Sequence, residues 1–436
     1  MLLSEVVSYY CKGNYFARKT IVLQDYFIKS HQNSARQVAS FELFCYLCYM
    51  NTLLLTLITF AVAFVGVAVI HPYLVRFAKA KNIVDNPNTR KIQLRPVPVL
   101  GGLAIFFGIV VGMLAAHTVV SCAEIFVILA CMMIMTYVGA LDDVLDISPV
   151  IRLIAEVAVI LILIYIGGFS LNNFHGLWGI GALPEWVAVL ITIVAVTGII
   201  NAINLIDGAD GLFSIFCMSV CAIYGTLFIA VGDYSLYALA IAAIGAVIPF
   251  LLHNAFGIES KMFVGDGGSL QMGVVLSVFV MEIICKPEYS AIAAAENLAL
   301  VPFVLATLSI PVFDTLRVMS ARIARGISPL IGDKTHLHHL FIGLGISHIG
   351  TAVLITLLNL CVVVVWHASA RGGCSADMQL YVVIATALLL DWGIYYLVAL
   401  LDKTIPERMN RLREWKMNHR PSRRLFDFMR KIVDKM

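Results

Sequence analysis

Residues 184–200 read PEWVAVLITIVAVTGII, residues 201–211 read NAINLIDGADG, and residues 212–231 read LFSIFCMSVCAIYGTLFIAV. Each outer run is almost entirely apolar, and its 17 or 20 residues fall within the range of length of a transmembrane α-helix. The segment between them holds two asparagines and two Asp-Gly pairs, and such a polar turn cannot lie exposed in lipid. This stretch predicts two membrane-spanning helices joined by a short polar loop, and the same alternation recurs along the chain.

The composition of the whole chain agrees with this pattern. Of 436 residues, 61% are hydrophobic and 13% are charged, and the mean hydropathy is +0.92. A soluble domain is about half apolar and roughly a quarter charged, so a soluble globular protein is excluded. The net charge of +3 leaves no footprint for nucleic acid. We expect an all-α polytopic membrane protein with about eleven transmembrane helices, at 51–74, 99–119, 122–140, 149–168, 184–201, 212–231, 235–254, 268–285, 298–316, 350–367 and 378–400.

Basic residues are concentrated on one side of this predicted bundle. When the loops are numbered alternately, 23 of the 30 Lys and Arg residues fall in one set, which includes the C-terminal tail. The other loops between spans hold only Lys286 and Arg371. Because basic loops stay in the cytoplasm, we expect a cytoplasmic C-terminus and an N-terminus outside. The tail 402–436 is expected to lie on anionic headgroups as a basic amphipathic helix.

Residues 1–49 carry five basic residues, which this parity would place outside. Two interpretations are open. The segment is either an upstream stretch added by an early start codon, with Met50 opening the natural chain, or a genuine N-terminal extension. We favour the first, because no basic start followed by an apolar core opens the sequence.

Three of the predicted cytoplasmic loops carry carboxylates in unusual groupings. Asp142 and Asp143 are adjacent at the end of a span, where they repel each other unless a cation lies between them. Asp207 and Asp210 share one short loop, and Asp266 lies in a Gly-rich turn that leads into a helix. A helix cap or a connecting turn needs fewer carboxylates than this. Because all five are expected on one membrane face, they predict a site for a hard divalent ion and a phosphate ligand.

The remaining polar loops supply cations. Lys91 lies in a basic, proline-containing loop that ends at Gly101-Gly102, which suits a phosphate-facing loop, although a simple positive-inside anchor is the alternative. Arg322 and Arg325 precede a histidine motif formed by His336, His338 and His339. These histidines could form a zinc site, but no cysteine accompanies them and the neighbouring aspartates favour Mg²⁺. Phosphate binding or proton transfer is therefore the preferred role.

This inventory of aspartates, histidines and basic residues fits phosphoryl transfer, in which Mg²⁺ bridges phosphates and cations neutralise developing charge. A membrane transporter would instead place its ionisable groups near mid-bilayer. The polar residues expected there, Glu156, Glu282, Asn359 and Asp391, are too scattered for a pathway, and Asp391 has no evident role. A purely structural membrane protein would need no such cluster.

The motifs also resemble those of a known family. They are Arg90-Lys91 with Pro96-x-Pro98 and Gly101-Gly102, Asp142-Asp143, Asn201-Ala-x-Asn204-Leu-x-Asp207-Gly-x-Asp210-Gly211, Gly265-Asp266-x-Gly268-Ser269 and His336-x-His338-His339. In this order, over about residues 50–345, the chain resembles the polyprenyl-phosphate N-acetylhexosamine-1-phosphate transferases of glycosyltransferase family 4. One departure is Gln93, where many relatives carry histidine.

The resemblance implies a Mg²⁺-dependent phosphotransferase, with Mn²⁺ as an alternative ion. Such an enzyme, spanning about residues 50–401 in a bacterial cytoplasmic membrane, joins a cytoplasmic UDP-sugar to polyprenyl phosphate and releases UMP. The H-x-H-H form resembles the enzymes that transfer N-acetylglucosamine 1-phosphate to undecaprenyl phosphate at the first membrane step of cell-envelope polysaccharide synthesis, such as O-antigen. The phospho-MurNAc-pentapeptide transferase of peptidoglycan synthesis is the alternative. The oligomeric state stays open.

The resemblance also implies roles for single residues. Asp266 would be the leading metal ligand, with Asp142 and Asp143 at the metal and the lipid phosphate. Asn204, Asp207 and Asp210 would line the nucleotide-sugar site, and Asp142, Asp143, Asp207 and Asp210 would form the catalytic group. The remaining substrate-binding residues would be Lys91, Arg322, Arg325, His336, His338 and His339.

Overall fold

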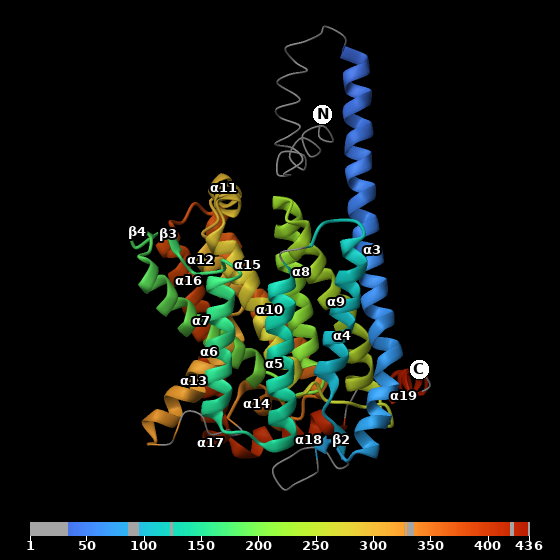
Figure 1. Ribbon diagram of the computed structural model, residues 1–436. Helices are drawn as coiled ribbons and strands as arrows, with labels where there is room; N and C mark the ends of the chain where they lie inside the picture. The colour runs from blue at the N-terminus through green and yellow to red at the C-terminus, as the bar shows by residue number, and fades with distance from the viewer. Residues whose placement is uncertain are drawn as a thin grey trace.

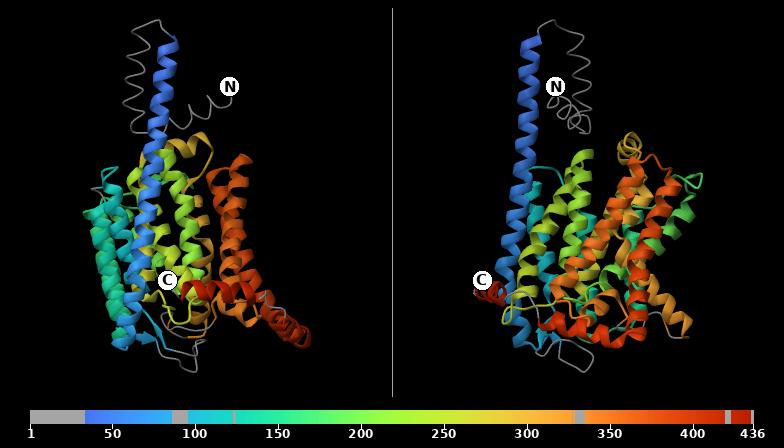
Figure 2. Two further views of the ribbon diagram at one scale, coloured as in Figure 1. Left: turned by 90° about the vertical axis from the view of Figure 1, so that its right-hand side faces the viewer. Right: turned by 180° about the vertical axis from the view of Figure 1, so that it is seen from behind.

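The computed structural model describes residues 34–85, 96–122, 125–326, 328, 335–418 and 423–434. They form a bundle of long helices with two small antiparallel hairpins (Figures 1 and 2). The hairpins pair β1 (Val84–Asp85) with β2 (Val97–Pro98) and β3 (Asn173–Leu177) with β4 (Ile180–Ala182). The helices are α3 (Ser34–Ala80), α4 (Gly101–His117), α5 (Ile125–Leu145), α6 (Pro149–Tyr165), α7 (Glu185–Leu205), α8 (Leu212–Val231), α9 (Tyr234–Phe256), α10 (Gly265–Cys285), α11 (Pro287–Ala295), α12 (Leu300–Thr307), α13 (Ser309–Ala324), α14 (Leu337–Gly343), α15 (His348–Arg371), α16 (Ala376–Leu388), the π-helix η1 (Leu389–Gly393), α17 (Ile394–Thr404), α18 (Pro406–Asn418) and α19 (Arg423–Val433).

The prediction of an all-α, multi-span membrane protein is confirmed. Helices lie on all eleven predicted ranges, and eight of the described helices are long and apolar enough to cross a membrane, or nine if α11 and α12 form one bent span. Helices α4 and α6 have 17 residues each, or about 25 Å, which is near the lower limit of length for a transmembrane helix.

The single helix predicted over 298–316 is wrong, because the structure divides this range at Leu308. Pro311 lies in the first turn of α13 and has no N–H to donate to Thr307. Asn359 of α15 satisfies the broken ends: its Nδ2 donates to Thr307 O at 2.8 Å, and its Oδ1 accepts from Ile310 N at 3.1 Å. The mid-span position of Asn359 is therefore explained by the break, since unpaired backbone groups are costly in an apolar bundle.

Helix α10 lies at the centre of the bundle, in contact with α4, α5, α7 and α8 (Figure 1). All of its residues from Gly267 to Ile284 are buried. Its Gln271 amide donates from Nε2 to Gly102 O at 2.6 Å and accepts from Thr136 Oγ1 at 3.1 Å. One buried polar side chain thus ties α10 to both α4 and α5.

Glycines allow α4 and α5 to approach the start of α10 backbone to backbone. A Cβ atom added at Gly102 would lie 2.2 Å from the backbone N of Gly268, and one added at Gly139 would lie 2.3 Å from that of Gly267. Small residues at such crossings are typical of packed membrane helices. The crossing places the end of α5 beside the start of α10, where the predicted aspartates lie.

The N-terminal part of α3 and the C-terminal helix α19 lie toward opposite ends of the bundle. Helix α3 passes through Met50 without a break and, in Figure 1, extends well beyond the other helices toward its N-terminal end. Residues 1–33 lie outside the described residues. At the other end, α18 and α19 lie near the ends of the long helices, and α19 lies beside α3 in both views of Figure 2.

Candidate active site

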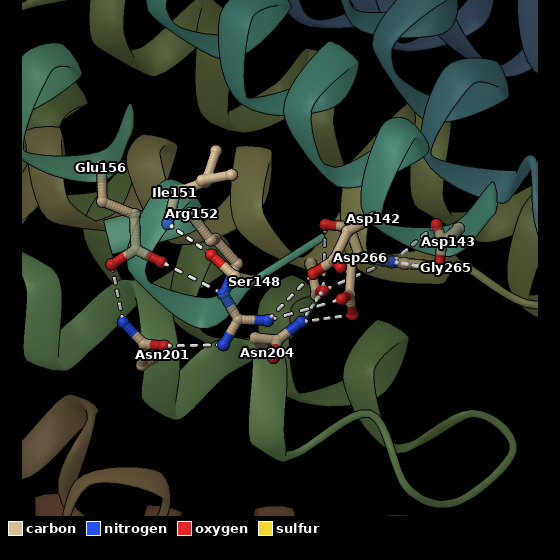
Figure 3. Close-up of polar contacts among 11 residues, drawn as sticks. Asp142, Asp143, Ser148, Ile151, Arg152, Glu156, Asn201, Asn204, Gly265 and Asp266 are labelled. Carbon is tan, nitrogen blue, oxygen red and sulfur yellow. Dashed lines mark hydrogen bonds and ion pairs between the residues drawn. The ribbon is translucent and has the colours of Figure 1, made fainter. Parts of the chain in front are cut away.

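Two helix ends bring three of the predicted aspartates together. Asp142 and Asp143 lie in the last turn of α5, and Asp266 lies in the first turn of α10 (Figure 3). The backbone N–H of Asp266 donates to Asp143 Oδ2 at 2.9 Å. The side chain of Asp266 accepts from Asn204 Nδ2 at 2.8 Å. Residues that are distant in the sequence therefore meet around the start of α10, as the shared-face argument predicted.

Arg152, in the first turn of α6, lies between these carboxylates (Figure 3). Its Nη1 lies 3.4 Å from Asp142 Oδ2 and 3.5 Å from Asp266 Oδ2. Its Nη2 donates to Asn201 Oδ1 at 3.3 Å, and its Nε lies 3.6 Å from Glu156 Oε1. A single guanidinium thus contacts α5, α7 and α10 and offsets repulsion among the acids.

We expect Arg152→Met to lower kcat/KM of the reaction at this site about a hundredfold, because the acids lose the cation that orients them. Arg152→Lys should lower it about tenfold, since an ammonium cannot reach several acceptors at once as the planar guanidinium does. Initial rates of product formation measure both. The exposed Arg76→Met in α3 is the matched control, and wild-type kcat/KM in Arg152→Met would contradict the assignment.

The aspartates open into a pocket of about 630 Å³. Its lining includes Asp143, Asp207, Asp210 and Asp266, together with Asp85, Gly208, Asn254, Lys261, Phe263, Gly265, His339 and His348. Carboxylates and cations therefore share one cavity, which is large enough for a charged ligand of nucleotide size.

Asp207 and Asp210 occupy different electrostatic environments in this pocket. Burial raises the pKa of Asp207 well above its usual range, and the charges of Asp266, Asp210 and Asp143 add to this effect. Burial opposes ionisation of Asp210 as well, but the hydrogen bond from His348 and the charge of Lys261 at 2.7 Å lower its pKa overall. Asp210 is thus a stable anion, whereas no cation among the described residues offsets the effect of burial on Asp207.

The three histidines of the motif lie in different places. His336 is buried, and its Nδ1 lies 2.7 Å from Asp314 Oδ2. His338 is also buried and packs against the loop at Gly208, where an added Cβ would lie 1.8 Å from its Nε2. His339 lines the pocket. His339 is therefore the histidine placed to contact a ligand there, while the other two join α14 to α13 and to the 201–211 loop.

The buried His338 makes stability sensitive to acid. Burial, followed by the charges of His339 and His336, lowers its pKa to about 3 from 6.5. Between these values the unfolded state binds more protons than the folded state, so stability falls as the pH drops below 6.5. We expect His338→Asn to reduce the loss of stability between pH 7 and 5 by up to about 1.4 kcal/mol per pH unit. Thermal unfolding of both proteins measures this, and an unchanged pH slope would contradict it.

A buried arginine explains Asp391, for which the sequence offered no role. Arg317 pairs with Asp314, donates from Nη2 to Thr335 O at 2.7 Å and lies over the ring of Tyr395, 3.7 Å from its centre. Asp391 in η1 is fully buried, and its Oδ2 lies 3.9 Å from Arg317 Nε. Asp391 is therefore a buried counter-charge to the arginine that holds the segment before the histidine motif.

An apolar groove of about 510 Å³ adjoins the acidic cluster. Side chains of α6, α7, α10, α12 and α13 line it, including Leu153, Val194, Ile284, Val304 and Leu316. Arg152, Glu156 and Asn201 also line it. Because Arg152 contacts Asp142 and Asp266 as well, the apolar groove and the charged pocket approach each other at this residue.

The donor atoms suit a hard divalent cation. Asp143, Asp207 and Asp266 all line the pocket with oxygen ligands, which Mg²⁺ prefers. Among the described residues, no three His, Cys, Asp or Glu side chains form a complete ligand set. Mg²⁺ usually binds through one or two carboxylates, water and substrate phosphates, so an open carboxylate set fits this ion better than a closed zinc site.

The remaining predicted residues are placed differently. Lys91 lies outside the described residues. Arg322 is buried at the end of α13, Arg325 is exposed just after it, and neither lines the charged pocket. Arg152, Lys261 and His348 are site residues that the sequence motifs did not indicate. One feature of the sequence could have pointed to Arg152 and Lys261, because each is the sole basic residue of a loop expected on the cytoplasmic face.

The sequence of this chain is similar to those of known proteins. Residues 125–284 match the model of glycosyl transferase family 4. The undecaprenyl-phosphate alpha-N-acetylglucosaminyl 1-phosphate transferase of Yersinia pestis is 31% identical over 314 residues, which cover 71% of this chain and 81% of that protein. The enzyme of the same name from Escherichia coli K12 is 30% identical over 65% of this chain and 75% of its own length. A probable undecaprenyl-phosphate N-acetylglucosaminyl 1-phosphate transferase of Bacillus subtilis strain 168 is 28% identical over 69% and 81%.

The fold and the site define a multi-pass membrane protein whose clustered aspartates lie between a charged pocket and an apolar groove. The comparisons place it among known proteins: the chain belongs to glycosyl transferase family 4. The resemblance found from the motifs is thereby confirmed.

Proposed function

We propose that the protein transfers N-acetylglucosamine 1-phosphate from UDP-N-acetylglucosamine to undecaprenyl phosphate, with release of UMP. The observation that carries this proposal is the approach of the two cavities at Arg152, which lines the apolar groove and lies 3.5 Å from Asp266 of the charged pocket. An apolar groove suits a polyprenyl chain, and a pocket with aspartates, Lys261 and His339 suits a nucleotide sugar with its metal ion. The names of the similar proteins given above support the same substrates.

The lipid phosphate is the nucleophile in this proposal. A phosphate monoester has its second pKa near about 6 and is mostly dianionic at pH 7, so it needs little activation. Its oxygen attacks the sugar-bearing phosphorus of the UDP-sugar, the new P–O bond forms, and the bond from that phosphorus to the UMP oxygen breaks. Arg152, at the end of the groove, orients the acceptor phosphate, and Asp142 accepts the proton of any monoanion that enters.

The pocket residues act on the donor. Lys261 and His339 offer hydrogen bonds to the diphosphate, and Asn204 holds the Asp266 carboxylate in position. Asp266 would be the leading ligand of Mg²⁺, with Asp142 and Asp143 beside it and the remaining ligands supplied by substrate phosphates and water. When bound, this ion supplies Lewis-acid stabilisation of the charge on the diphosphate.

We further propose eleven membrane crossings with the C-terminus in the cytoplasm of a bacterium and the N-terminus outside. The basic loops and the charged pocket then lie on the cytoplasmic face, where UDP-sugars are made. Labelling of single cysteines introduced at Lys286 and Arg371, on one side, and at Lys261, on the other, tests this orientation. Labelling of all three by the same impermeant reagent in intact cells would contradict it.

Release of UMP by the purified full-length protein tests the reaction. We expect UMP and a lipid diphosphate sugar only when UDP-N-acetylglucosamine, undecaprenyl phosphate and Mg²⁺ are all present. Turnover of UDP-MurNAc-pentapeptide in place of UDP-N-acetylglucosamine would instead assign the protein to peptidoglycan synthesis. UMP release without lipid phosphate, or no release with either donor, would contradict the proposal.

A further inference from the structure

The C-terminal helix α19 packs against a turn formed by residues 258–260, which lies between α9 and α10 and precedes Asp266. Phe426 of α19 packs against Phe256 at the end of α9, with 5.3 Å between ring centres. Val433 is buried. Figure 2 shows α19 beside the lower part of α3 and away from the other C-terminal helix α18, and α19 packs against α9. The docking thus joins two parts of the chain separated by more than 170 residues.

Asp434 makes the polar contact of this docking. Its Oδ1 accepts from the backbone N–H groups of Ile258, Glu259 and Ser260 at 3.0, 3.2 and 3.1 Å, and from Ser260 Oγ at 2.9 Å. Burial opposes ionisation, but these hydrogen bonds lower the pKa of Asp434 overall. One carboxylate therefore gathers three successive amides, a geometry in which an anion is strongly favoured over a neutral amide side chain.

The same turn is held from two other helices. His71 of α3 contacts Ser260 O through Nε2 at 2.8 Å, and His253 of α9 contacts Ser260 Oγ through Nδ1 at 2.9 Å. The two histidine rings stack with centres 4.0 Å apart. Lys79 of α3 donates to Glu259 O at 2.7 Å. Side chains of α3 and α9 therefore hold the 258–260 turn from within the bundle, and Asp434, just after α19, holds it from outside.

The turn leads directly into the charged pocket. Lys261, the next residue, pairs with Asp210 at 2.7 Å, and Phe263 accepts from Gly101 N at 3.0 Å. Lys261, Phe263, Gly265 and Asp266 all line the pocket. The position of the 258–260 turn therefore sets where the Lys261 ammonium lies in the pocket.

We propose that Asp434 is a positioning residue, through which the C-terminal helix holds the 258–260 turn and keeps Lys261 in place for the nucleotide-sugar diphosphate. This inference rests on the proposed function for the identity of the ligand. It assigns a role in donor binding to a helix outside the membrane-spanning bundle, and it predicts an effect on the donor rather than on the lipid acceptor.

Asp434→Asn in the full-length protein tests this. We expect KM for UDP-N-acetylglucosamine to rise about five- to tenfold, because the three amides then donate to a neutral amide oxygen in place of a carboxylate and these hydrogen bonds weaken, while KM for undecaprenyl phosphate stays within about twofold. Asp434→Glu, which keeps the charge, should recover most of the donor affinity. The matched control is Asp427→Asn on the same helix, whose exposed carboxylate lies 3.4 Å from Arg430 Nη1 one turn along that helix.

The outcomes separate the two proposals. Absence of UMP release by the wild-type protein would refute the proposed function. A wild-type protein that is active, together with an Asp434→Asn variant whose donor KM is unchanged, would overturn this inference alone. Equal rises in KM for donor and acceptor would overturn it as well, because they would indicate a general structural role. Limited proteolysis supplies a readout without activity: cleavage at Lys261 should be faster in Asp434→Asn than in Asp427→Asn.

Discussion

Asp266→Asn should reduce UMP release by roughly a hundred- to a thousandfold. Asp266 contacts three other residues of the site. Its backbone N–H donates to Asp143, and its carboxylate accepts from Asn204 and lies beside Arg152. Asparagine keeps the size and the acceptor oxygen, but it removes the negative charge that the proposed metal ion requires. Initial rates of UMP release at saturating donor and acceptor measure the loss.

Asp146→Asn is the matched control for this variant. Asp146 is exposed just after α5, and its φ of 52° lies in the left-handed region that asparagine adopts readily. The same chemical change close to the site should therefore leave the rate within about twofold of the wild type. Raising Mg²⁺ should not restore full activity to Asp266→Asn. A rate near the wild-type value in Asp266→Asn would remove Asp266 from the proposed metal site.

Gly102→Ala should both destabilise the protein and lower its activity. The added methyl group would lie within 2.7 Å of three backbone atoms of Gly267 and Gly268, and backbone atoms cannot turn aside as a flexible side chain can. Overpacking of this kind costs about 3 kcal/mol. The same shift moves the start of α10, because Gly102 N donates to Val264 O at 2.7 Å. A displacement of about 1 Å at a catalytic group can cost roughly a hundredfold in rate.

Thermal unfolding and UMP release of Gly102→Ala measure these two effects. Gly343→Ala is the control, because an added Cβ at this exposed glycine of α14 meets no atom within 4 Å. We expect Gly343→Ala to melt within a few degrees of the wild type. A Gly102→Ala protein with unchanged melting temperature and rate would show that α4 and α10 have room to separate without moving Asp266.

Much of this architecture follows from local features of the sequence. A run of about 20 apolar residues must form a helix in lipid, so the helices at 184–201, 212–231 and 235–254 could be located to within a few residues. The loops that carry the motifs could also be predicted to lie on one face of the membrane, because alternate loops of a membrane bundle return to the same side. The five motifs, in the order in which they occur along the chain, were sufficient to identify the family. The break at Leu308 was missed, because an apolar run does not reveal how a partner such as Asn359 will satisfy an interrupted helix.

The sequence by itself therefore determined the class of the protein, the membrane-spanning ranges and four of the aspartates that line the charged pocket, since each depends on apolarity or on chemical type at short range. Only the tertiary structure decided what these residues touch. It placed Arg152 against Asp266, a residue 114 positions away, and it buried His336 and His338 while leaving His339 at the pocket. It also brought Asp434 to the turn before Lys261. Such contacts are set by how helices cross and how closely glycine backbones approach, and these depend on all the neighbours of a residue at once.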